Sequence, residues 1–166
     1  MKAHFTMFAR YNAWANVTLY DAAAELPQEA YERDEGAFFG SLQRTLNHIL
    51  VADVLWMARF RSWPQPKIPL DGMMHEPLAE LRAAREAQDA DILQWVDGLS
   101  QADLDAQITY TTITGPKTMT QVLAPAMSHF FNHQTHHRGQ AHMILTRLTG
   151  DAPPLDLLFY QRQEAA

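Results

Sequence analysis

The stretch from Thr118 to Gly150 restricts the possible folds of this chain more than any other segment. It contains five of the eight histidines, at positions 129, 133, 136, 137 and 142. We predict that it forms one long helix, which hydroxyl caps at Thr118 or Thr120 begin and Gly150 ends in a left-handed conformation. Pro125 is late for the first turn of that helix, so either the helix begins nearer Leu123 or one backbone hydrogen bond is lost.

Two of these histidines fall on the apolar side of the predicted helix. At about 100° per residue, His133 and His137 lie one turn apart in a stripe whose other members are Leu123, Ala126, Phe130, Ala141, Ile144 and Leu148. Side chains at this spacing can bind one metal ion, although a pair of neutral, hydrogen-bonded core histidines would give the same pattern. A catalytic zinc-type site has three protein ligands and one open position, so another segment must supply a third ligand.

The composition predicts one domain over residues 1–166, large enough to bury a core. No apolar run approaches the roughly 18 residues of a membrane span, and the N-terminal segment lacks the apolar centre of a signal peptide. Zero cysteines exclude disulfides and thiolate ligands from this chain, and we expect a cytoplasmic protein. The net charge of −6, with 13 scattered basic residues, argues against a nucleic-acid partner.

Apolar periodicity predicts three further helices, over residues 3–25, 41–61 and 77–97, with Ser41 as the cap of the second. The segment 28–40 is charged and bounded by glycine, and 62–76 is rich in proline, so both are expected to be connectors. The predicted fold class is therefore all-α, a four-helix bundle. Such bundles build metal sites from side chains on facing helices.

Three shorter segments complete the prediction. Residues 100–105 are expected to form a short capped turn. Ile108–Met119 is rich in threonine around Gly115-Pro116, which predicts a small hairpin or an extended excursion before the last long helix. Residues 155–161 are expected to pack back onto the bundle.

The second predicted helix is apolar nearly all round, which indicates burial on more than one side. Its extra apolar face suggests a homodimer, but it could equally contact the C-terminal segment. Asp53 lies in the main apolar stripe of this helix, and a buried carboxylate needs a donor such as an imidazole N–H or an arginine. His48 lies on a different face of the same helix.

With these elements placed, the chain resembles the DinB/YfiT-like family of metalloproteins. The matching segments are Y-N-A-W-A-N (11–16), L-N-H-I-L-V-A-D-V-L-W (46–56) and N-H-Q-T-H-H-R-G-Q (132–140). They occur in the family's order and spacing, and the likeness covers most of residues 5–160. The resemblance implies an up-down-down-up four-helix bundle, often dimeric, in which three histidines hold a divalent metal, usually zinc or nickel.

Carried over position by position, the resemblance implies that His48, His133 and His137 are the metal ligands. The assignment of His48 rests mainly on this resemblance, because the helical periodicity leaves it off the main stripe. His129, one turn before His133, is the reserve ligand. His136 could compete for the metal, although its direction on the helix disfavours this.

Other polar residues near the motif are candidates to orient the ligating imidazoles, namely Asp53, Arg138 and Gln140. A salt bridge at the surface is an equally good explanation of Arg138. The remaining histidines, His4, His75 and His142, are expected to be ordinary surface residues.

A cation held by three neutral imidazoles lowers the pKa of bound water, and the same position could take a small-molecule thiol. Characterised relatives in the resembled family include transferases and an isomerase that use low-molecular-weight thiols. We therefore expect a metal-dependent enzyme with a small-molecule substrate, either a thiol S-transferase or a hydrolase. The alternative is a non-catalytic metal-binding or stress-response module, because no carboxylate base or nucleophile stands out near the motif. Imidazole suits zinc, nickel, copper and iron alike, so the sequence does not choose the metal.

Overall fold

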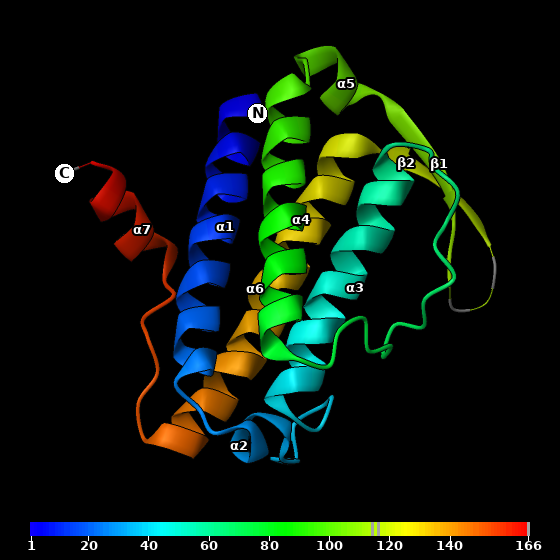
Figure 1. Ribbon diagram of the computed structural model, residues 1–166. Helices are drawn as coiled ribbons and strands as arrows, with labels where there is room; N and C mark the ends of the chain where they lie inside the picture. Colours follow the sequence, from blue (N-terminus) through cyan, green and yellow to red (C-terminus); the bar gives the residue numbers. More distant parts are fainter. Residues whose placement is uncertain (114, 116, 166) are drawn as a thin grey trace.

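A computed structural model of the chain describes residues 1–113, 115 and 117–165 (Figure 1). These residues form seven helices and one two-stranded sheet, which confirms the all-α class. The four long helices are α1 (Lys2–Ala24), α3 (Leu42–Phe60), α4 (Leu78–Gly98) and α6 (Leu123–Thr149). They pack side by side, with α3 against α6 and α1 against α4. In Figure 1, α1 and α6 run downward, whereas α3 and α4 run upward.

Three short helices lie between or after the long ones, α2 (Gln28–Glu32), α5 (Gln101–Asp105) and α7 (Leu157–Glu164). The segment 28–40 is therefore not only a connector, because it begins with α2. The predicted capped turn is α5, whose first turn is closed by reciprocal hydrogen bonds between Ser100 and Asp103. Helix α7 packs on α1 through the buried Tyr160, as expected for a C-terminal segment that returns to the helices.

The start of the long helix at Thr118 or Thr120 is wrong, and the alternative start near Leu123 is confirmed. Strands β1 (Gln107–Thr111) and β2 (Thr118–Val122) form an antiparallel hairpin, and α6 begins at Leu123. Threonine favours strands because its branched side chain is restricted in helices. A start at Leu123 also leaves Pro125 in the first turn, where its missing N–H has no intrahelical acceptor.

Two glycines, one at the hairpin turn and one at the end of α6, have positive φ values. Gly150 ends α6 in the left-handed conformation, at φ 77°. In the predicted Gly115-Pro116 turn, Gly115 also has a positive φ of 67°, and Pro116 lies outside the described residues.

The extra apolar face of α3 is covered within the chain. Val51 and Leu55 are buried, and Trp56 lies edge-on against Tyr110 of β1. The hairpin contacts this face through β1, whereas the C-terminal helix α7 packs on α1, and the homodimer stays a prediction. In the described part of the chain, no helix combines the length and apolarity needed to cross a membrane.

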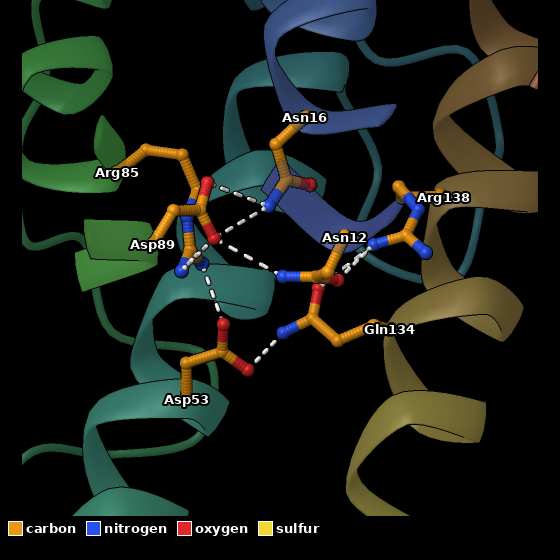
Figure 2. Close-up of polar contacts among 7 residues, drawn as sticks. All are labelled: Asn12, Asn16, Asp53, Arg85, Asp89, Gln134 and Arg138. Atoms are coloured by element: carbon orange, nitrogen blue, oxygen red, sulfur yellow. Dashed lines mark hydrogen bonds and ion pairs between the residues drawn. The ribbon is translucent and has the colours of Figure 1, made fainter. Parts of the chain in front are cut away.

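A layer of buried polar residues separates two apolar clusters in the interior. One cluster contains Phe5, Phe60, Ile92 and Phe130, and the other contains Leu19, Leu46, Leu81 and Ile144. Between them, each long helix contributes at least one member of the polar layer, which consists of Asn12, Asn16, Asp53, Arg85, Asp89, Gln134 and Arg138 (Figure 2).

Arg85 stands at the centre of this polar layer. Its Nη1 lies 2.7 Å from Oδ2 of Asp53, and its Nη2 lies 2.9 Å from Oδ1 of Asp89. Asn12 and Asn16 of α1 donate further hydrogen bonds to Asp89, at 3.0–3.1 Å. The arginine thereby joins α3 to α4, and its two carboxylate partners join these helices to α6 and α1.

Hydrogen bonds also hold the side chains of α6 in the layer. Gln134 donates a hydrogen bond from its side-chain amide to Asp53, and Arg138 donates one to Oδ1 of Asn12. The two arginines and two aspartates balance in charge, which a low-dielectric interior requires.

We predict that Arg85→Met destabilises the protein by about 3–5 kcal/mol, because it leaves two carboxylates buried without their cation. The matched control is Arg82→Met, one turn earlier on the exposed face of α4, where Arg82 pairs with Asp21 and Glu86. The control should lose no more than about 1 kcal/mol. Urea unfolding of both variants measures the difference, and equal losses would contradict the assigned importance of the layer.

Candidate metal centre

Three imidazoles gather between α3 and α6. His48 comes from α3, and His133 and His137 come from α6; one ring nitrogen of each lies within 4.8 Å of the others. Their ring centres are 4.3 Å apart for His133 and His137, 4.5 Å for His48 and His137, and 5.3 Å for His48 and His133. The three side chains that the resemblance implied as ligands are therefore brought together in space, and their geometry is compatible with one bound cation.

The polar layer explains how α6 presents its two histidines to α3. Gln134 directly follows His133, and Arg138 directly follows His137. Successive residues of a helix point about 100° apart. When Gln134 and Arg138 face the interior layer (Figure 2), the two histidines are turned toward α3. The rotation of α6 is therefore set by buried polar contacts adjacent to each imidazole.

Hydrogen bonds fix which nitrogen of two imidazoles carries the proton. Nδ1 of His48 lies 2.6 Å from the carbonyl oxygen of Leu70, and Nδ1 of His137 lies 2.8 Å from Oε1 of Gln140. Both acceptors require an N–H at Nδ1, which leaves the lone pair on Nε2. Gln140 thus has the orienting contact that the sequence suggested for it.

The free nitrogens turn toward one another. Nε2 of His48 is buried and has no hydrogen-bond partner among the described residues. Nε2 of His137 lies 3.1 Å from Nε2 of His133. A buried nitrogen without a partner is costly, and a cation that all three lone pairs could share would satisfy it. The donor set therefore fits a divalent metal on the evidence of its own hydrogen bonding.

The electrostatics of the cluster keep its imidazoles neutral. Burial lowers the pKa of His133 to about 3, with repulsion from His137 and His48 adding to the effect. Burial also lowers the pKa of His137 to about 4, although the hydrogen bond to Gln140 opposes the change. The pKa of His48 is lowered by burial as well. Neutral imidazole is the form that binds metals, so the site needs to lose no proton near pH 7.

We predict that metal affinity falls at a lower pH than it does for unperturbed histidines. The sign follows from the lowered pKa values: protons compete for His137 and His133 only near pH 4 and 3, and the pKa of His48 is lowered as well, so each imidazole stays neutral to a lower pH than a free one. Chelator competition at several pH values measures this. A peptide with unperturbed histidines is the control, and it should lose metal from about pH 6.5. The same early loss in the protein would contradict the prediction.

The other histidines lie outside the cluster. The ring of His129 is 5.9 Å from that of His133 and lies against Trp56. His136 is exposed, and its Nε2 is 3.3 Å from the side-chain nitrogen of Gln140. The remaining three are distributed over the surface, with His75 near Glu80 and with His4 and His142 beside a cavity between α1 and α6.

Asp53 and Arg138 belong to the polar layer and form no hydrogen bond or ion pair with the three imidazoles. Asp53 is paired with Arg85, so its donor is an arginine, one of the two kinds that the sequence indicated. Arg138 is 2% exposed, which excludes the surface salt bridge considered for it. Both residues act on the cluster only through the orientation of the helices that bear it.

Two contributions to the site come from the segments 28–40 and 62–76, which the sequence predicted to be connectors. Phe39 stacks on His48, with ring centres 3.9 Å apart and planes inclined by 23°, and it lies 5.5 Å from the ring of His137. Leu70 supplies the carbonyl that His48 contacts. The sequence contained a signal for the position of Phe39, namely the glycine that follows it. Glycine permits a positive φ, and Gly40 has a φ of 82° in the turn before α3.

A cavity of about 250 Å³ adjoins the cluster. Its wall includes His133, His129, Trp56 and Arg59, and Tyr110 of the hairpin closes one side. A larger cavity of about 690 Å³ lies on the opposite side of α6, between α1 and the segment before α7, and none of the three clustered imidazoles lines it. Of the three clustered imidazoles, that of His133 lines the smaller cavity, and a small molecule could approach the cluster there.

Fold and site together define a helical protein with three neutral histidines arranged around a point suited to a divalent metal. The model of the DinB family matches residues 1–165, so the chain belongs to the DinB family. It is also similar to Protein DinB of Bacillus subtilis (strain 168), with 27% identity over 160 residues that cover 90% of this chain and 89% of the relative. The family membership inferred from the three sequence segments is confirmed.

Proposed function

We propose that this protein is a metal-dependent enzyme in which His48, His133 and His137 hold a divalent ion, zinc or nickel, within an up-down-down-up four-helix bundle. The observation that supports this most strongly is the buried Nε2 of His48, which has no protein partner among the described residues and belongs to a ring that has one nitrogen within 4.8 Å of a nitrogen of each of the other two imidazoles. A bound ion would supply a Lewis acid that lowers the pKa of a thiol or water in the adjoining cavity.

The chain's own residues would prepare the site in three ways. The carbonyl of Leu70 and the side chain of Gln140 hold two imidazoles in the tautomer that binds metal. Phe39 covers His48 and keeps water from that side. The polar layer fixes the rotation of α6. Such preorganisation avoids rearrangement when the reaction occurs.

The cavity favours thiol S-transfer over hydrolysis. The described residues that line it include no carboxylate to act as a general base. A low-molecular-weight thiol brings its own nucleophile, which suits a site that offers none. Hydrolysis is the second candidate, supported by His129, a neutral imidazole in the same wall whose pKa is lowered by burial. A non-catalytic metal-binding module remains the alternative from a different class.

We predict that the purified protein binds close to one equivalent of zinc or nickel and that His133→Ala loses most of it. The substitution removes one of the three ligands and leaves α6 with a single ligating imidazole. His142→Ala is the matched control, because it removes an imidazole from the same helix at a position outside the cluster. Elemental analysis after gel filtration measures all three proteins. Equal metal contents would refute the assigned ligand set.

We predict that the metal-loaded protein conjugates small thiols, such as bacterial low-molecular-weight thiols, to an electrophile such as chlorodinitrobenzene. The activity should disappear after chelation, return with the metal, and be absent in His133→Ala. Ester and amide substrates test the hydrolase candidate in parallel. Metal binding without turnover in any of these assays would leave the non-catalytic module as the supported function.

A further inference from the structure

Arg59 is a buried cation without an anionic partner. Its side chain lies between two aromatic rings, with Cζ 4.5 Å from the ring centre of Trp56 and 5.1 Å from that of Tyr110. The residue is only 9% exposed, and its Nε is buried without a hydrogen-bond partner. In the part of the chain that the structure describes, no carboxylate lies within ion-pair distance of it. A buried charge is normally paired, so this guanidinium has unused binding capacity.

Arg61, two residues further along the chain, shows how the same side chain is satisfied elsewhere. Both of its terminal nitrogens donate to the carboxylate of Asp91, each at 2.8 Å, and it also stacks on Trp63. The two arginines therefore differ in their partners: the half-buried Arg61 has both an aromatic neighbour and a carboxylate, whereas the buried Arg59 has only the aromatic neighbours. Arg61 thus provides a matched comparison.

Arg59 and the metal centre share one cavity. The cavity of about 250 Å³ is lined by Arg59 at one place and by His133 at another, with Ala52 and Leu55 of α3 along its wall. Eleven residues separate His48 from Arg59, which is three helical turns, so both lie on one side of α3 about 16 Å apart along its axis. A small molecule in the cavity would therefore extend from His133 of the cluster toward the guanidinium.

The charges in this cavity have one sign. None of the described residues that line it carries a carboxylate. The pKa of His129 in the same wall is lowered by burial and, in addition, by the positive charge of Arg59. Asp71 lies near His48 and is exposed on the loop before α4. A cavity whose charges have one sign attracts an anion, and a charge-assisted hydrogen bond to the guanidinium would hold it.

We propose that Arg59 binds the carboxylate of a small organic substrate, whose other end lies at the three-histidine cluster. Planar guanidinium forms two parallel hydrogen bonds to a carboxylate, and the flanking rings of Trp56 and Tyr110 hold it in one plane. The substrate class is therefore a small organic acid with its reacting group separated from the carboxylate by an aliphatic chain. This inference rests on the proposed function for its reacting end, and on Arg59 alone for its acidic end.

The first experiment tests Arg59 without any metal. The arginine Nε–H resonances of the metal-free protein are followed by NMR during titration with hexanoate and, separately, with hexanol. The Arg59 resonance is assigned by its absence in Arg59→Lys. Hexanoate should shift this resonance with saturation, hexanol should not, and the resonance of Arg61 should stay in place. If hexanoate leaves Arg59 unmoved, or if hexanol moves it equally, the carboxylate site does not exist.

The second experiment links the carboxylate to the metal. The cobalt-substituted protein is titrated with mercaptohexanoate and with mercaptohexanol, and thiolate coordination is read from its charge-transfer absorption. Mercaptohexanoate should bind about tenfold more tightly or better. Arg59→Gln should abolish that advantage, Arg59→Lys should retain part of it, and Arg61→Gln should leave it unchanged.

The outcomes separate the two proposals. Equal affinity for the two thiols in the unsubstituted protein overturns the role of Arg59 in substrate binding. Absence of the absorption with both thiols, with cobalt bound, overturns thiol activation but leaves the result of the NMR titration to decide on Arg59. The comparison of acid with alcohol uses the unsubstituted chain, so it holds even where a variant fails to fold.

Discussion

The buried ion pair of Arg85 with Asp53 and Asp89 is the interaction on which the rest of this protein depends. Charged groups in an interior must be matched by partners in a fixed geometry, and these partners come from different helices. The apolar clusters above and below would tolerate small shifts of one helix along another. The ion pair and its amide partners do not, so they set the relative rotation of the helices and, through Gln134 and Arg138, the direction of the imidazoles on α6.

Local periodicity was sufficient to predict the long helices and the paired histidines of α6. It also showed that Asp53 needs a donor and that an arginine would serve. It did not identify Arg85, because the spacing along the chain between α3 and α4 contains no information on which residues face each other. His48 was assigned through resemblance, since its position on α3 differs from the main apolar stripe. The start of α6 was misplaced because threonine hydroxyls can cap a helix but also occur in strands.

Two kinds of feature could not be predicted from the sequence. One is a contact made by an irregular segment, and the other is a difference in surroundings between two residues of the same type. Phe39 approaches His48 only because the turn at Gly40 places it there. Arg59 and Arg61 lie two residues apart and have the same chemistry, and only their surroundings distinguish the half-buried, paired Arg61 from the buried Arg59, which has no ion-pair partner among the described residues. Differences of this kind arise from tertiary packing, and the spacing of residues within one helix or strand does not predict tertiary packing.

The hydrogen bond from His48 to the carbonyl of Leu70 has an evolutionary consequence. Every residue type carries a backbone carbonyl, so a change of side chain at position 70 leaves the acceptor unaltered. A change in the length of the loop would displace it. The loop is further tied at its end to Asn47, which accepts from the backbone N–H of Met74 and His75. For this hydrogen bond, the residue type at position 70 should therefore matter little among relatives, whereas insertions and deletions in the segment should be rare.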